Sequence, residues 1–311
     1  MNVLSLFDGM ACGRLALEKA GIKVDNYFAS EIDKYAITIA KKNWPDIIHV
    51  GDVQNVKGAD LPKIDLLIGG SPCQGFSFAG KQLNFDDPRS KLFFDFVRLK
   101  DECKPKYFLL ENVKMKKESQ QIITEYMGVD PVEINSALVS AQNRRRLYWS
   151  NLPIEQPEDK GIMLADILQY DEIGIIKSYG KLELRNEKAI CLDANYHKGL
   201  DNHGQHTGVC KLAGYADLKG HDYVRRVYDP SRKAPTLNAH SGGNLEPKTT
   251  TDYKTWRKLT PLECERLQTV PDNYTSGVSN SQRYKMLGNG WTVDVIAHIF
   301  KKIIDTPHKR A

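Results

Sequence analysis

Short apolar segments alternate with amphipathic ones over the first 110 residues, and no other feature constrains the fold as much. The predicted strands lie at residues 2–7, 25–30, 65–68 and 107–110. The predicted helices lie at residues 11–21, 33–44 and 91–102. Strands that alternate with helices in this way form a parallel sheet with helices on both faces. The sequence therefore predicts an α/β fold.

The alternation stops near residue 150. Residues 151–255 instead contain turn-forming sequences such as DNHGQHTG and HSGGN, which are typical of a smaller, loop-rich and mostly β domain. A helical pattern returns at TPLECERL, and residues 291–304 are amphipathic. We therefore expect a first domain at residues 1–155, a second at residues 156–258, and a C-terminal segment at residues 259–311 that packs back on the first domain.

The composition is that of an ordinary globular protein, with 41% hydrophobic and 27% charged residues. No apolar run approaches the ~18 residues that span a membrane, and no secretory signal is visible, so we expect a cytoplasmic protein. The net charge of +5 permits a nucleic-acid partner without requiring one. The six cysteines show no paired spacing, which favours free thiols.

A cluster of metal-ligand residue types lies near residue 200. It consists of His197, His203, His206 and Cys210. Because its spacing fits no closed zinc site, we expect no bound metal.

Acidic residues follow three successive strands of the predicted sheet. They are Asp8, Glu31 and Asp52. Ligands of parallel sheets bind beyond the carboxyl ends of the strands, so a cofactor with a ribose and an amine could use all three side chains. The loop that contains Asp8 reads FDGMACG rather than GxGxxG, which disfavours a nicotinamide cofactor.

Two further strand ends carry residues of types that can take part in catalysis. Cys73 follows Pro72 in the loop GGSPCQGFS, and Glu111 ends the next apolar strand in FLLENV. Alone, such a cysteine is more often a buried filler and such a glutamate a surface or capping residue. Together they suit attack on cytosine, since a thiolate can add to carbon 6 only if electrons are drawn toward ring nitrogen 3, and a carboxylic acid there supplies that pull.

The whole ordered set of motifs resembles the cytosine-carbon-5 DNA methyltransferase family. The motifs are LFDGMACG, the strand ending at Glu31, GDV, SPCQGFS, ENV, QNRRRLYW, RKLTPLECERLQTVPDNYT and MLGNGWTV. They cover nearly the full chain, in family order. The segments FDGMACG, SAQNRRRLYWSNLP and GNGWTV are also similar to animal de novo DNA methyltransferases.

The resemblance implies a Rossmann-like S-adenosylmethionine-dependent methyltransferase fold, in which residues 156–258 form a mostly β target-recognition domain. It also implies that Cys73 bonds to carbon 6 of a flipped cytosine while carbon 5 takes the methyl group. Glu111 would activate the base, and Arg144 and Arg146 would orient both. Two residues apart on a predicted strand, these arginines should share a face.

The resemblance further assigns residues to the cofactor and to DNA. The cofactor set is Phe7, Asp8, Gly9, Met10, Glu31, Ile32, Asp52, Val53, Pro72, Leu92, Asn289, Gly290 and Trp291. The DNA set is Gln74, Ser77, Thr236, Gly242 and Gly243. We also expect the polar loop after Cys73 to close over the flipped nucleotide, so that Gly80→Pro would impair base flipping.

Double-stranded DNA is the expected partner, and we expect a monomeric prokaryotic or phage enzyme, acting with a restriction endonuclease or alone. One alternative is a tRNA cytosine methyltransferase, although that branch of the family carries a Cys-Phe-Thr tripeptide that this chain lacks. Another is a catalytically inactive DNA-binding regulator. The presence of Cys73, Glu111, Arg144 and Arg146 argues against it.

Overall fold

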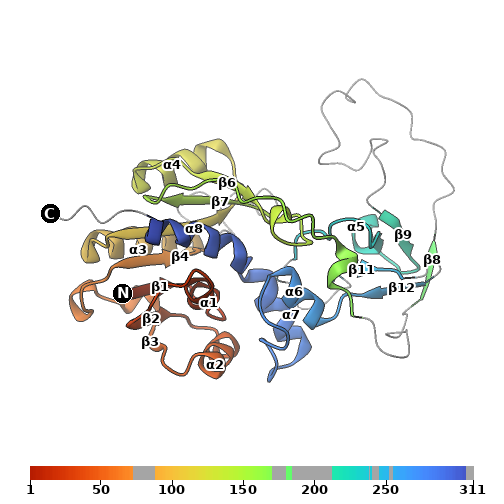
Figure 1. Cartoon of the computed structure of the whole chain (residues 1–311), viewed down its shortest axis with the longest axis horizontal. Helices are drawn as coiled ribbons and strands as arrows, with labels where there is room; N and C mark the ends of the chain where they lie inside the picture. Colours follow the sequence, from red (N-terminus) through yellow and green to blue (C-terminus); the bar gives the residue numbers. More distant parts are fainter. Residues whose placement is uncertain are drawn as a thin grey trace.

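The computed structural model describes residues 1–72, 88–169, 180–183, 212–237, 239, 245–251 and 255–305. A large α/β part and a small β part lie at opposite ends of the long axis, with α6 and α7 between them (Figure 1). No helix in the described ranges is both long and apolar enough to cross a membrane.

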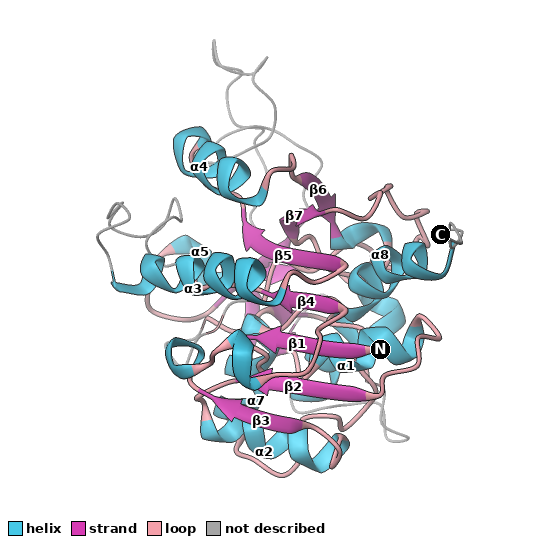
Figure 2. Cartoon of the chain, turned by 90° about the vertical axis from the view of Figure 1, so that its left-hand side faces the viewer, coloured by secondary structure: helices cyan, strands magenta, loops and turns pink. Residues whose placement is uncertain are grey.

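Seven strands form the sheet of the large part (Figure 2). They are β1 Asn2–Leu6, β2 Asn26–Ser30, β3 Ile48–Gly51, β4 Leu66–Gly69, β5 Tyr107–Val113, β6 Val132–Asn135 and β7 Arg145–Ser150. Their order is β3-β2-β1-β4-β5-β7-β6. The first five strands in this order pair in parallel, and β7 is antiparallel to both of its neighbours. The predicted α/β fold is confirmed, and β7 makes the sheet mixed rather than wholly parallel.

Helices cover both faces of this sheet. One face packs on α1 Cys12–Lys19, α2 Lys34–Asn43 and α8 Val293–Asp305, and the other on α3 Pro88–Cys103 and α4 Lys117–Met127. Alternate strand residues supply the two cores: Leu66 and Ile68 lie in the first, and Leu67 in the second. A strand buried on both faces is apolar throughout, which explains the continuous apolar runs in the sequence.

Local signals set the ends of these helices. Asp33 caps α2 by accepting from the backbone N–H groups of Tyr35 and Ala36. Gly21, with φ +75°, follows α1 as the predicted stop. The helix α4 was not among the predicted elements, although Gly128 (φ +71°) marks its end in the same way.

The small part is a closed barrel of short strands with the order β10-β11-β12-β8-β9. They are β8 Gly180–Glu183, β9 Leu212–Ala216, β10 Arg226–Tyr228, β11 Lys248–Thr249 and β12 Thr255–Lys258, with the one-turn helix α5 Asp222–Arg225 before β10. All strand pairs here are antiparallel except β10 with β11. This is the small, mostly β part that the composition predicts.

The chain returns from the barrel to the large part through α6 Pro261–Leu267, α7 Asn280–Asn289 and α8. Ile296 and Phe300 of α8 are fully buried in the same core as Leu15 of α1. Lys19 of α1 adds an ion pair to Asp294 at 2.8 Å. The last helix is therefore part of the large core.

The barrel is joined to the large part by the segment after β10. Ala234 donates its N–H to Ala141 O at 2.7 Å, and Asn143 N donates to Ala234 O at 3.0 Å. The ammonium group of Lys233 donates to the carbonyls of Ala137, Ser140 and Ile162. Together these bonds fix the barrel's connection next to the start of β7.

Candidate active site

One cavity of about 410 Å³ opens at the carboxyl ends of the parallel strands. Every residue that the sequence assigned to the cofactor lines it: Phe7, Asp8, Gly9, Met10, Glu31, Ile32, Asp52, Val53, Pro72, Leu92, Asn289, Gly290 and Trp291. Glu111, Arg144 and Arg146 line it too. Its volume is in the range of small-molecule sites, which span about 300–1,000 Å³.

Glu31 follows β2 and is fixed by backbone donors. Its Oε2 accepts from Gly9 N at 2.7 Å, and its Oε1 accepts from Ile32 N and Asp33 N, both at 2.8 Å. A carboxylate oxygen has further acceptor sites, so this fixed group can still receive hydroxyl donors such as those of a ribose. Beside it, the Ile32 side chain is 74% exposed and offers an apolar surface at the rim.

Asp8 lies below this rim and is buried. Its Oδ1 accepts from Ser5 Oγ and Tyr27 OH, each at 2.6 Å, whereas its Oδ2 is buried with no hydrogen-bond partner among the described residues. Burial raises the pKa of Asp8 from 3.8 to about 7, against the opposing effect of these two hydrogen bonds. The shift means that this carboxyl group holds its proton up to near-neutral pH.

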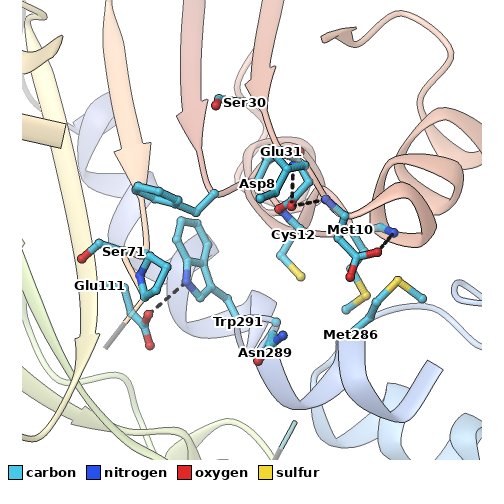
Figure 3. A pocket seen from close by; sticks show the side chains of 18 of the residues that line it. Asp8, Met10, Cys12, Ser30, Glu31, Ser71, Glu111, Met286, Asn289 and Trp291 are labelled. Atoms are coloured by element: carbon cyan, nitrogen blue, oxygen red, sulfur yellow. Dashed lines mark hydrogen bonds between the residues drawn. The ribbon is translucent and has the colours of Figure 1, made fainter. Parts of the chain in front are cut away.

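Glu111 lies at the opposite side of the cavity from Met10 and Met286 in Figure 3. Its Oε1 forms an ion pair with Arg146 Nε at 3.0 Å, and its Oε2 accepts from Trp291 Nε1 at 3.2 Å. The antiparallel pairing of β5 with β7 brings Arg146 to this position, since it pairs with Val113. Glu111 is thus a nearly buried carboxyl group with a donor on each oxygen.

Arg144 has a different environment from Arg146. It precedes β7, is buried, and donates to the carbonyls of Leu237, Gly288 and Gly290 at 3.0–3.2 Å. Burial lowers the pKa of its guanidinium group to about 10, which leaves it charged at neutral pH. Both arginines line the cavity: Arg146 contacts Glu111, and Arg144 binds carbonyl groups of the turn after α7.

The chain that leads into Cys73 is held from β5. Asn112 Nδ2 donates to Ser71 Oγ at 3.2 Å and to Ser71 O at 3.4 Å. The sequence reading did not single out Asn112, although its place in ENV, directly after Glu111, was the available signal. Cys73 itself lies outside the described residues, as do Gln74, Ser77 and Gly80.

The rim has one more pair that the sequence reading missed. Lys285 of α7 forms an ion pair with Asp33 at 2.7 Å, and both residues line the cavity. The signal was helical spacing, because Lys285 and Asn289 are four residues apart on one helix face.

Of the expected DNA-binding residues in the second domain, the structure describes only Thr236. Thr236 lies where the barrel joins the large part, and its Oγ1 donates to Asn143 O at 2.6 Å. Gly242 and Gly243 lie outside the described residues, and so do His197, His203, His206 and Cys210. In the described ranges, no group of His, Cys, Asp and Glu side chains could hold a metal ion.

Comparisons with known proteins agree with this geometry. The family model for C-5 cytosine-specific DNA methylases matches residues 1–305. The type II methyltransferase M1.ScrFI of Lactococcus lactis subsp. cremoris is 33% identical over 99% of this chain and 79% of its own length. The orphan methyltransferase M.SPBetaI of Bacillus phage SPbeta is 28% identical over 98% of both chains. The structure of the methyltransferase EhMeth of Entamoeba histolytica aligns with a TM-score of 0.70 at 16% identity, over 98% of both chains.

The cavity suits the methyl donor of that family. It joins fixed carboxylates at adjacent strand ends with apolar walls, as a ligand with a ribose, an adenine and a sulfonium group requires. The chain therefore belongs to the C-5 cytosine-specific DNA methylase family, and it is an S-adenosylmethionine-dependent DNA (cytosine-5-)-methyltransferase.

Proposed function

We propose that Cys73 is the nucleophile of this enzyme and that Glu111 activates the target cytosine. The observation that carries the proposal is the position of Glu111. It lies on the wall of the cofactor cavity, paired with Arg146, and the adjacent Asn112 holds the segment that leads into Cys73. The positions of Glu111 and of Ser71, two residues before Cys73, support placing the acid and the thiol at the same edge of the sheet.

In this proposal the Cys73 sulfur forms a bond to carbon 6 while Glu111 donates a hydrogen bond to ring nitrogen 3. The electron pair that leaves the ring double bond makes carbon 5 nucleophilic. S-adenosylmethionine supplies a methyl group activated by its sulfonium. Loss of the proton from carbon 5 and cleavage of the carbon–sulfur bond then restore the aromatic ring and the free thiolate.

The remaining residues of the cavity bind and orient. We assign the ribose to Glu31, the adenine edge to Asp52 and the adenine face to Phe7, because these three residues follow adjacent strands around one cavity. Arg146 orients Glu111. Arg144 acts further away, by fixing the turn that carries Asn289.

We propose that duplex DNA binds between the cavity and the barrel and that the target base is flipped out of the stack. Residues 1–155 and 259–311 would form the catalytic part, and residues 156–258 would read the sequence. The position of the barrel at the far end of the long axis supports this division (Figure 1). The DNA contacts would include Gln74, Ser77, Thr236, Gly242 and Gly243.

The two relatives described above leave two biological settings, because one is a type II methyltransferase and the other an orphan phage methyltransferase. Both settings require the same chemistry on duplex DNA, so a restriction partner is a separate question from the proposed mechanism.

The test is methyl transfer from labelled S-adenosylmethionine to duplex DNA and, separately, to tRNA. We expect label in DNA from the wild type and none from Cys73→Ser. Cys103→Ser is the matched control, since Cys103 is a free cysteine on α3 and should tolerate the change. A duplex with 5-fluorocytosine should trap the covalent adduct, because fluorine cannot leave as a proton. Label in tRNA alone, or transfer by Cys73→Ser, would contradict the proposal.

A further inference from the structure

The two oxygens of Glu111 are held from two distant parts of the chain. Arg146, which binds Oε1, lies on the neighbouring strand, whereas Trp291, which binds Oε2, is 180 residues away in sequence. Trp291 lies in the turn between α7 and α8. Figure 3 shows its indole reaching across to Glu111 from that turn. Because Trp291 and Glu111 are so far apart in sequence, their contact depends on a fixed position of the turn that carries Trp291.

The turn is fixed by buried polar groups. The Gly290 carbonyl accepts from Arg144 at 3.0 Å and from Gln268 Nε2 at 3.2 Å. On the other side of Trp291, the Thr292 hydroxyl donates to Gln268 Oε1 at 2.9 Å and accepts from Ser136 Oγ at 2.8 Å. The backbone on both sides of Trp291 is therefore anchored.

Gly70 leaves the space in which the indole N–H meets the carboxyl group of Glu111. A Cβ atom on Gly70 would lie 3.0 Å from both Glu111 Oε2 and Trp291 Nε1, so Gly70 packs directly against the hydrogen bond. The lack of a side chain at Gly70 thus lets the indole N–H approach the carboxyl group.

We propose that Trp291 is a positioning residue for Glu111. Its indole N–H holds the carboxyl group in the orientation that meets ring nitrogen 3 during addition of the thiolate. A protonated carboxyl group donates through its O–H and keeps acceptor sites on both oxygens, so it can accept from Trp291 and Arg146 while its O–H meets ring nitrogen 3. The proposal rests on the proposed function, since it gives Trp291 a part in the step that Glu111 assists.

The ring and the N–H of Trp291 should have separable effects. The ring lines the cofactor cavity, whereas the N–H binds Glu111. Trp291→Phe keeps an aromatic ring and removes the donor, and benzothienylalanine at this position keeps the full bicyclic shape with sulfur in place of N–H. Trp291→Ala removes both.

The addition step can be measured without the methyl donor. Bonding of the thiolate to carbon 6 makes carbon 5 basic enough to take a proton from water. Loss of the original hydrogen from carbon 5 and departure of the thiolate then complete an exchange. DNA labelled with tritium at carbon 5 of cytosine should therefore release tritium to solvent with no S-adenosylmethionine present.

We expect Trp291→Phe and the benzothienylalanine variant to release tritium about 10- to 100-fold more slowly than the wild type, as loss of one hydrogen bond to a charged group implies. Their kcat for methylation should fall equally, with the KM for DNA and the Kd for S-adenosylhomocysteine within about twofold of the wild type. Trp291→Ala should weaken S-adenosylhomocysteine binding as well. Gly70→Ala keeps the tryptophan but displaces the contact, so it should reproduce the slower exchange.

The matched control is Trp149→Phe. Trp149 is fully buried on the other face of the sheet, and its Nε1 donates to Thr124 Oγ1 at 2.9 Å. This change should leave exchange at the wild-type rate. Wild-type exchange by Trp291→Phe, or an equal loss in Trp149→Phe, would overturn the positioning role. If the wild type itself methylates no DNA cytosine, the proposed function fails instead.

Discussion

Asp8 is a buried acid whose second oxygen has no partner among the described residues, and it sits beside a cofactor cavity. Burial raises its pKa from 3.8 to about 7. The folded state therefore binds this proton more tightly than the unfolded state does. The contribution of this group to the free energy of unfolding is fully present below about pH 4. It decreases as the pH rises from about 4 to about 7, and it stays constant above that pH.

We predict that Asp8→Asn removes this pH dependence. Relative to the wild type, the variant should gain about 2 kcal/mol in free energy of unfolding between about pH 5.5 and pH 8. Guanidinium unfolding of both proteins at the two pH values measures the difference. Equal pH dependence in the two proteins would show that Asp8 ionises normally in the folded state.

Among the acidic residues that line the cofactor cavity, we expect substitution of Glu31 to weaken cofactor binding most. Glu31→Gln keeps the size of the side chain but replaces one carboxylate oxygen with an NH₂ group. That group cannot accept a hydrogen bond from a backbone donor such as Gly9 N. We expect at least about tenfold weaker binding of S-adenosylhomocysteine by calorimetry, as loss of a charged hydrogen bond implies. Glu18→Gln, at an exposed position of α1, is the control and should bind as the wild type does.

Among the elements, α6 depends on a buried ion pair. Glu263 caps this helix and pairs with both terminal nitrogens of Arg257, at 2.7 and 2.8 Å, with both side chains almost fully buried. We predict that Glu263→Leu costs about 3–5 kcal/mol in free energy of unfolding, because it leaves a buried guanidinium uncompensated.

The double variant Arg257→Leu with Glu263→Leu tests the reason. If the cost comes from the unpaired charge, the double variant should be clearly more stable than Glu263→Leu alone in urea unfolding. A double variant that is less stable than either single variant would show that the pair itself supplies the stability.

The elements of the sheet could be predicted because each has a local signal. Apolar runs mark β1 and β4, and Gly21 marks the end of α1. The acids at the strand ends followed from the same pattern. By contrast, the contacts of Arg144 and Trp291 join segments more than 90 residues apart. Such contacts depend on how α7, α8 and the barrel connection pack together, which no local pattern reports.

Across the whole molecule, stability should depend on the last helix. Phe300 is fully buried in the core that α8 shares with α1, whereas Ile304 on the same helix is 57% exposed. We predict that Phe300→Ala lowers the free energy of unfolding by about 3–5 kcal/mol. Ile304→Ala should change it by less than about 0.5 kcal/mol. Urea unfolding measures both, and similar losses would show that α8 is not anchored by Phe300.

The return of α8 to α1 also has a consequence for the order of events during protein synthesis. The sheet face under α8 is translated well before the helix that covers it. At about 5–20 residues per second, roughly 14–55 s pass between the synthesis of α1 and that of α8. Throughout that time, part of the apolar surface of the nascent chain has no cover. The large core therefore closes only after α8 has left the ribosome, and until then exposed apolar segments of the nascent chain are open to association.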